Sequence, residues 1–201
     1  MSQEKIIIIG PKCLTKHKVK LANYLLMKNN DLSIVNTFTT DESTSENQNS
    51  SLYYNYYIPF TTVEDAYKND AIVYCTIGST LDITHGVMKD EFYNNDIMYL
   101  DFIDFNNISN KLFDELDSTQ TPVLIVWLDS SHVWSQYNNS YEIKEDVTES
   151  KYTLNKIENN CLAQLYFNVD NEHMTDITET ILEYYMTNDK DVRESIIFNN
   201  N

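Results

Sequence analysis

The sequence contains little glycine and almost no arginine. Its 201 residues include three glycines and a single arginine, Arg193, which lies in a polar stretch. Tyrosine and asparagine are abundant by contrast, a bias that suggests an AT-rich genome and carries no information on mechanism. Lysine replaces arginine poorly where a planar, bidentate cation is needed, so this scarcity limits the phosphate chemistry that the chain can support.

Cysteine is also scarce. Cys13, Cys75 and Cys161 lie far apart, are odd in number and form no Cys-x-x-Cys pair. This pattern indicates buried free thiols in a reducing compartment and argues against a zinc site. We therefore expect an intracellular protein, either cytoplasmic or virion-associated.

Long hydrophobic runs and excess positive charge are missing as well. The apolar run near the N-terminus is too short for a signal peptide, and no stretch approaches a membrane span. The formal net charge of −17 argues against binding to a nucleic-acid backbone. The length suits one domain, or one core with an inserted subdomain, and a hydrophobic content of 42% is enough for a buried core.

The most informative stretch is the strand, loop and helix at the start of the chain. Four consecutive isoleucines, Ile6–Ile9, predict a central strand of a parallel sheet. Gly10 and Lys16 then have the spacing of the phosphate-binding pattern G-x-x-x-x-G-K-[ST], but Thr15 and His17 replace its second glycine and its magnesium-binding hydroxyl. Two interpretations stay open here: a degenerate nucleotide-binding loop, and an ordinary strand-to-helix turn with a chance lysine.

Apolar periodicity predicts the remaining elements. Further strands are expected over 32–38, 53–60, 71–77, 97–102, 123–128 and 165–169. Helices are expected over 16–29, 62–69 (with capping-box patterns from Thr61 and Thr62), 87–94, 108–116, the stretch marked by Leu154, Ile157, Cys161 and Leu165, and 175–187. The polar stretch 40–51 predicts an exposed loop.

Long apolar strands that alternate with helices predict an α/β fold with a parallel sheet. Ligands of open α/β sheets bind beyond the C-terminal strand ends, where Gly10, Asp101 and Asp129 lie. The two aspartates could hold Mg²⁺ through water, or could equally cap neighbouring backbone. His17 and His85 could bind a metal with Asp101, although lone histidines of this kind are usually structural.

The order of these elements resembles the guanylate kinase family along nearly the whole chain. In chain order, the resemblance is carried by Asn36–Asp41 (against Ser-x-x-T-T-R), Asn55–Ile58 (D-Y-x-F), Ala71–Val73 (F-L-E), His85–Lys89 (Y-G-T-x-K), Tyr99–Asp101, Ile125–Ser130 (I-F-I-x-P-P) and Asn168–Asn171 (N-D-D). The resemblance implies a parallel-sheet P-loop kinase-like core over 1–32 and 96–190. It also implies a small mixed α/β insertion like the family's nucleoside-monophosphate-binding region over 33–95, followed by a polar tail over 191–201.

The resemblance also implies a set of site residues. The nucleotide-binding loop would use Gly10, Lys12, Lys16 and His17. The substrate-binding positions that survive are Tyr56, Gly86, Lys89 and Asp101.

Most of the family's charged and base-reading groups are missing from this sequence. Asp41 replaces the T-T-R arginine, Val73 the guanine-reading glutamate and His85 the tyrosine of Y-G-T. The segment 137–151, which corresponds to the arginine-rich lid, is acidic and contains no arginine. Because the family's phosphoryl transfer depends on neutralising charge with arginines, a loop lysine and Mg²⁺, these losses argue against catalysis.

Three functions remain open. In the first, the chain is a degenerate guanylate-kinase-like protein (a pseudokinase with an altered Walker A loop) that has no catalytic residues, cofactor or metal and serves as a protein-binding or structural module. In the second, it is an active nucleoside-monophosphate kinase of altered specificity that uses ATP and Mg²⁺ with a GMP or dNMP acceptor. That alternative needs lysines in place of arginines, namely Lys12, Lys16, Lys18 and Lys89. In the third, the likeness is accidental. The expected partner is a basic or apolar protein, with a nucleotide as the alternative ligand and with neither nucleic acid nor membrane.

Overall fold

A computed structural model of the chain describes residues 4–41, 55–77, 84–100, 111–136 and 161–200, together with positions 141, 144, 147, 148 and 151. The described strands are β1 (Lys5–Ile9), β2 (Thr37–Thr39), β3 (Asn55–Tyr57), β4 (Ile72–Ile77), β5 (Thr84–Met88), β6 (Ile97–Tyr99), β7 (Val123–Asp129) and β8 (Cys161–Asn168). The described helices are the 3₁₀ turn η1 (Lys12–Leu14), α1 (Thr15–Lys28), α3 (Phe60–Lys68), α4 (Lys89–Asn94), α5 (Lys111–Thr119), α6 (Ser131–Gln136), α8 (Met174–Met186) and α9 (Lys190–Asn200).

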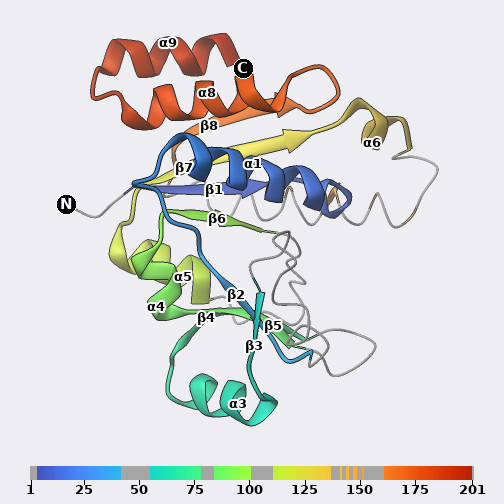
Figure 1. The fold of residues 1–201 in the computed structure, drawn as a ribbon, viewed down its shortest axis with the longest axis vertical. Helices are drawn as coiled ribbons and strands as arrows, with labels where there is room; N and C mark the ends of the chain where they lie inside the picture. The colour runs from blue at the N-terminus through green and yellow to red at the C-terminus, as the bar shows by residue number, and fades with distance from the viewer. Residues whose placement is uncertain are drawn as a thin grey trace.

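The first sheet has the strand order β6-β1-β7-β8, and all of its pairs are parallel. The isoleucine run of β1 lies between β6 and β7, with Ile7 paired to Met98 and to Ile125. Because all four strands run in the same direction, the loops that follow β1, β7 and β8 leave the sheet at the same end, at the C-terminal ends of the strands (Figure 1). The predicted central strand and parallel sheet are therefore confirmed.

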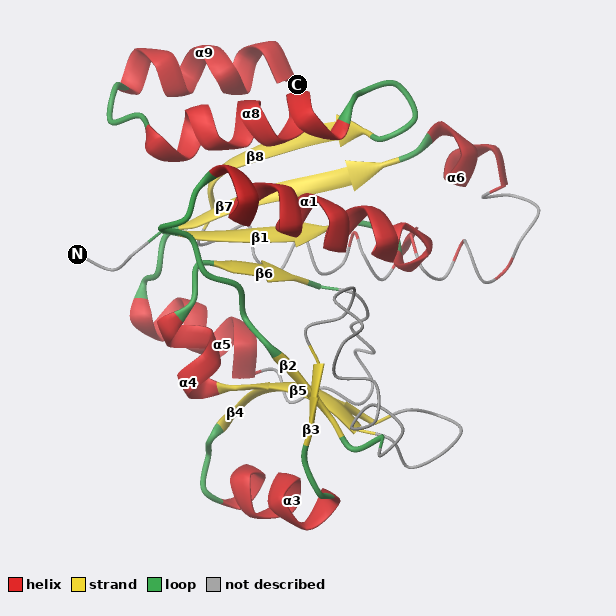
Figure 2. Ribbon diagram, viewed as in Figure 1, coloured by secondary structure: helices red, strands yellow, loops and turns green. Residues whose placement is uncertain are grey.

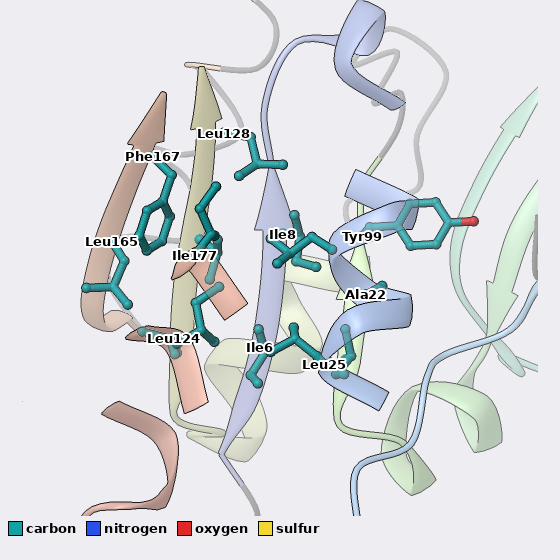
Figure 3. Close-up of a cluster of buried hydrophobic side chains, with 14 of the residues drawn as sticks. Ile6, Ile8, Ala22, Leu25, Tyr99, Leu124, Leu128, Leu165, Phe167 and Ile177 are labelled. Carbon is teal, nitrogen blue, oxygen red and sulfur yellow. The ribbon is translucent and has the colours of Figure 1, made fainter. Parts of the chain in front are cut away.

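Both faces of the first sheet are buried. Ile6 and Ile8 of β1 pack on one face with α1 and α8, as Figure 3 shows for Leu25 and Ile177. Ile7 and Ile9 face the other way, into a second cluster that contains residues of α5 and of the second sheet. This two-sided burial explains why β1 has no polar alternation.

The second sheet is mixed and has the strand order β3-β2-β5-β4. Strands β2 and β3 are parallel, whereas β5 is antiparallel to both of its neighbours. Val73 of β4 and Val87 of β5 share a hydrophobic cluster with Ile125 of the first sheet and with Leu112 and Leu116 of α5, so the two sheets have one core in common. The expected α/β architecture, a parallel core sheet with a small mixed unit, is confirmed.

The strand expected over 32–38 is divided between the two sheets. Ile34 forms an isolated parallel bridge with Ile97 at the outer edge of β6, and the chain then crosses to the second sheet, where β2 begins at Thr37. Of the loop expected over 40–51, all but the first two residues lie outside the described part of the chain.

The helix expected from Leu154, Ile157, Cys161 and Leu165 is wrong at its C-terminal end. Cys161 and Leu165 lie in β8, which begins four residues before the expected last strand, while 154–160 lie outside the described residues. Alternate residues of β8, Ala163, Leu165 and Phe167, are buried against the core. The period-two pattern of the strand therefore decides the structure there over the helical spacing.

Two other helix boundaries were also misplaced. Val87 and Met88 belong to β5, a strand that the sequence did not predict, so α4 begins only at Lys89. Helix α3 begins at Phe60 with Pro59 as its N-cap and without a side-chain cap, so the expected capping boxes are absent. The other expected strands and helices are present, with shifted ends where those ends are described; the expected residues 53–54, 101–102 and 108–110 lie outside the described part of the chain.

The segment expected as a polar tail forms helix α9. Ile196 is buried in the main hydrophobic cluster, and Val192 and Ile197 pack against that cluster. Figure 2 shows α9 running beside α8, along the side of the first sheet that β8 forms. No helix in the described part of the chain is both long and apolar enough to cross a bilayer.

Candidate functional site

The loop after β1 begins at Gly10, which lies against the end of β7. A Cβ atom at Gly10 would come within 2.5 Å of the carbonyl oxygen of Leu128. Glycine is therefore required here by the close approach of two strands. After Pro11, the turn η1 leads directly into α1, whose N-cap, Leu14, provides no side-chain hydrogen bond.

Lys18 lies beneath this loop and is completely buried. Its Nζ donates to the carbonyl oxygen of Gly10 at 3.0 Å and to that of Leu100 at 2.9 Å. These carbonyls lie at the ends of the adjacent strands β1 and β6, so one ammonium group joins two strand ends. From the sequence, Lys18 is expected only as one of several lysines that could replace arginines, because lysine is ordinarily a surface residue.

The other residues expected in the loop are arranged differently. Lys16 is exposed, and its side chain forms no hydrogen bond or ion pair with the described part of the chain. His17 is half-buried, and its Nδ1 atom is buried without a hydrogen-bond partner among the described residues. Lys12 lies in η1, but its side chain is outside the described part of the structure.

Asp129 lies at the end of β7, and both oxygens of its carboxylate accept hydrogen bonds from residues that follow it in the chain. One oxygen accepts from the backbone N–H of Ser130 at 2.7 Å, and the other accepts from the indole N–H of Trp134. Of the two roles considered for Asp129, the structure shows the capping of nearby donors. Asp101 lies outside the described residues, so the structure does not place it.

A second carboxylate at this edge, Asp170, comes from the turn after β8. It accepts from the hydroxyl of Ser130 at 2.9 Å and from the backbone N–H of His132 at 3.2 Å. The Ser130 hydrogen bond is the largest cause that lowers the pKa of Asp170. These contacts fix the first turn of α6 to the ends of β7 and β8, an arrangement that no motif in the sequence indicated.

Two expected substrate-binding residues, Tyr56 and Gly86, lie in one row of the second sheet. Phe38 of β2 is paired with Tyr56 on one side and with Gly86 on the other. A Cβ atom at Gly86 would lie 2.3 Å from the carbonyl oxygen of Tyr74 and 2.5 Å from the ring of Phe38. Gly86 is therefore in the middle of strand β5, against an aromatic ring.

Lys89, the third expected substrate-binding residue, belongs to a network of ion pairs outside this row. Its Nζ lies 2.7 Å from Asp70 and 2.6 Å from Glu115, and Asp70 also pairs with Lys111. Hydrogen bonds donated by Lys111 and Lys89 lower the pKa of Asp70 to about 2, and the hydrogen bonds that Lys89 donates to Asp70 and Glu115 raise the pKa of Lys89. The network joins the turn after α3 to α4 and α5.

No group of three or more His, Cys, Asp or Glu side chains that could hold a metal ion occurs among the described residues. His85 is exposed on β5, and its proposed partner Asp101 is not described. All three cysteines are free, as expected, but none is fully buried: Cys13 is exposed, and Cys75 and Cys161 are half-buried.

Arg193, the only arginine of the sequence, lies near the N-terminal end of β1, at the opposite end of this strand from Gly10. Its Nη2 is 3.3 Å from the carboxylate of Glu4, directly before β1, and its Nε donates to the carbonyl of Thr187 at 2.9 Å. The guanidinium also stacks over the ring of Tyr184, with 4.8 Å between Cζ and the ring centroid. Gly10 and the loop after it are at the other end of β1.

This combination of a parallel sheet, a glycine loop opening α1 and a small mixed sheet defines a guanylate kinase-like α/β fold. The solved guanylate kinase from Anaplasma phagocytophilum superimposes with a TM-score of 0.52 and 12% sequence identity, over 92% of this chain and 85% of that one. No model of a known protein family matches the sequence. No curated protein matches it either.

Proposed function

We propose that this chain is a guanylate-kinase-like protein that has lost phosphoryl transfer and serves as a protein-binding or structural module. The observation that carries the proposal is the position of Arg193, the only arginine in the sequence. Its guanidinium pairs with Glu4 and donates a hydrogen bond to the carbonyl of Thr187, at the opposite end of β1 from Gly10. A guanidinium at the transferring phosphoryl group is worth about 10³- to 10⁵-fold in rate, so its diversion would remove most of the activity.

The lysines offer little replacement for arginine. Lys18 is buried against two carbonyl groups, and Lys89 is held between two carboxylates. Among the described loop side chains, Lys16 is left as an accessible cation. A single flexible ammonium cannot reproduce the bidentate contacts that several guanidinium groups make with phosphate.

The described residues also fit Mg²⁺ poorly. His17 occupies the position of the hydroxyl ligand, and imidazole is a poor ligand for a hard cation that prefers oxygen. Both oxygens of Asp129 already accept hydrogen bonds from Ser130 and Trp134. We therefore propose a protein without a resident metal or cofactor.

The proposed partner is a basic or apolar protein. The net charge of −17 favours a positively charged partner by long-range attraction and disfavours nucleic acid. The exposed face of α8 contributes to this field with Asp176, Glu179 and Glu183.

The alternative is an active nucleoside-monophosphate kinase that uses ATP and Mg²⁺. Two observations favour it: Lys16 is exposed at the start of α1, and Tyr56 shares a row of the second sheet with Gly86. Under this alternative, GMP or a deoxynucleoside monophosphate would accept the phosphoryl group.

A coupled assay with ATP, Mg²⁺ and either GMP or dGMP separates the two functions, with an arginine-containing guanylate kinase as the positive control. We expect no turnover above background and no thermal shift with ATP, ADP, GMP or dGMP. Turnover that Lys16→Met abolishes would establish the kinase. In a second experiment, the immobilised chain captures proteins from a cell lysate. Capture that is equal for the native chain and Lys16→Met, and that added polylysine competes with, supports the binding module.

A further inference from the structure

Helix α3 lies at the periphery of the second sheet. Figure 2 shows no described helix or strand on its far side. Val63 is the one buried side chain of this helix, and it packs with Phe38 and Ile72 in the small hydrophobic cluster of the second sheet. The helix therefore contacts the rest of the molecule along one narrow face, and most of its surface is exposed to solvent.

Two aromatic rings and a carboxylate lie on the exposed surface of α3. Phe60 and Tyr67 expose 48% and 53% of their surface, and Glu64 between them is exposed too. The three residues are spaced four and then three apart, so they share one side of the helix, which we call the aromatic face. Exposed rings gain free energy when they leave water, and aromatic residues are enriched at protein interfaces. The aromatic face therefore has the composition of a docking surface.

Glu64 is the carboxylate of this region that is left without a counter-ion. Asp65 lies 3.8 Å from Lys68 on the same helix, and Asp70 in the following turn pairs with Lys111. Glu64 forms no ion pair or hydrogen bond with the described part of the chain. Burying an unpaired charge is strongly unfavourable, so a partner that covers the aromatic face has to neutralise this carboxylate.

The structure already contains a cation beside one of these rings. The Nζ atom of Lys111 lies 5.0 Å from the centroid of the Tyr67 ring. A positive charge over an aromatic ring is attracted by the negative potential of the ring face. About half of the Tyr67 surface stays exposed beside Lys111, as does about half of Phe60. A second cation, from another molecule, can therefore approach these rings and reach Glu64 between them.

We propose that the aromatic face of α3 is the docking surface for a positively charged segment of another protein, whose lysine or arginine side chains lie against Phe60 and Tyr67 and pair with Glu64. This inference rests on the proposed function, because it names the partner and the surface of the binding module. The net charge of −17 attracts such a segment from a distance. Glu64 would repel an acidic peptide or a nucleic acid, and a purely apolar partner would bury its charge unpaired.

The probe is a short fluorescein-labelled peptide that repeats Arg-Gly-Leu, titrated with the full-length chain and followed by fluorescence anisotropy at about 0.15 M salt. Glu64→Gln should weaken binding about fivefold, because it removes the carboxylate of the aromatic face. Asp65→Asn removes the same charge one residue away, outside this face, and should change the affinity by less than about twofold. Phe60→Ser together with Tyr67→Ser should weaken binding about tenfold. Phe198→Ser, at a ring of α9 that exposes 84% of its surface, should leave binding unchanged.

Equal weakening by Glu64→Gln and Asp65→Asn would overturn the proposal, because binding would then follow net charge alone. A native chain that does not bind the arginine peptide, or that binds an otherwise identical glutamine peptide equally well, would overturn it too. So would binding that survives the double change at Phe60 and Tyr67. If circular dichroism shows that the double variant unfolds, the comparison of Glu64→Gln with Asp65→Asn decides alone, since both side chains are exposed.

The proposed function can fail separately from this docking surface. Turnover of a monophosphate with ATP rejects the non-catalytic module, whatever the arginine peptide does. A partner protein that the native chain and Glu64→Gln capture equally keeps the binding module but rejects the aromatic face as its surface.

Discussion

Arg193 and Glu4 pair at 3.3 Å although they are 189 positions apart in the sequence. The contact fastens α9 to the residue that precedes β1. The second carboxylate oxygen of Glu4 is buried without a hydrogen-bond partner among the described residues. Burial raises the pKa of Glu4, and the charge of Arg193 opposes this effect only in part. The chain's single guanidinium therefore has a structural task.

Removing this guanidinium should destabilise the fold. Arg193→Gln leaves the Glu4 carboxylate buried without its counter-ion, which we expect to lower the free energy of unfolding by about 2 kcal/mol. Urea unfolding followed by circular dichroism measures the change. Lys190→Gln, which removes an exposed pair with Glu194, is the matched control and should change stability by less than about 0.5 kcal/mol. Equal losses in the two variants would contradict the role assigned to Arg193.

Glu4 should also give the stability a defined dependence on pH. Its pKa is raised in the folded chain above the ordinary value of 4.5, so folding favours the protonated form. That contribution is fully present below the ordinary pKa and is lost as the pH rises through the raised one. Glu4→Gln removes the dependence, so its Tm relative to the native chain should increase as the pH is raised from 4.5. If the curves of Tm against pH are parallel for the native chain and Glu4→Gln, Glu4 does not titrate in this way.

Lys18 should be essential for stability rather than for binding. Lys18→Met keeps the length of the side chain but leaves the buried carbonyls of Gly10 and Leu100 without their donor, at a cost of about 3 kcal/mol. Denaturant unfolding without any nucleotide is the measurement. Lys16→Met, two residues away and exposed, should stay within about 0.5 kcal/mol. A stable Lys18→Met chain would show that the strand ends do not need this ammonium.

Gly86 should behave as a packing residue. Gly86→Ala places a methyl group against the carbonyl of Tyr74 and the ring of Phe38, and backbone paired in a sheet cannot easily move away. We expect a loss of about 2 to 3 kcal/mol in the ligand-free chain. His85→Ala, the exposed neighbour on β5, should have little effect. If Gly86→Ala keeps full stability but loses a ligand, a binding role is supported instead.

The network around Lys89 can be followed through Asp70. Its pKa of about 2 depends on hydrogen bonds from Lys111 and Lys89. Lys89→Met should move the pKa of Asp70 up toward its ordinary value of 3.8, as observed by carboxyl-carbon NMR. Lys68→Met, which removes an exposed pair with Asp65, should leave Asp70 unchanged. An Asp70 that titrates identically in both variants would show that Lys89 is not its partner.

The elements that could be predicted from the sequence are those with one strong pattern. The isoleucine run of β1 and the apolar run of β7 are buried on both faces, and such short runs of β-branched and apolar residues are typical of strands in a parallel sheet. Strand β8 was mistaken in part for a helix because Cys161 and Leu165 are four apart and fit a helical face as well as a strand. Strand β5 was missed because Gly86 interrupts its pattern, and the glycine is explained only in the fold, by the carbonyl of Tyr74 and the ring of Phe38.

The candidate site could be predicted less well than the fold. Gly10 and Lys16 are recognisable by spacing, but the burial of Lys18 depends on two carbonyls at strand ends that only the folded chain brings together. The contacts of Asp170 with the start of α6 join segments about 40 residues apart and leave no local signature. The sequence did reveal that arginine is nearly absent, and the structure adds where the remaining one is used.

Because β1 is a central strand, its pairing during synthesis must wait until its partner strands have been translated. Its partners β6 and β7 begin at Ile97 and Val123, so the first strand leaves the ribosome long before anything can pair with it. At about 5 to 20 residues per second, roughly 6 to 23 s separate the translation of Ile9 from that of Val123. Four bare isoleucines are then available to chaperones or to neighbouring nascent chains. Slowing translation ahead of codon 123 should therefore lower the soluble yield more than slowing it afterwards.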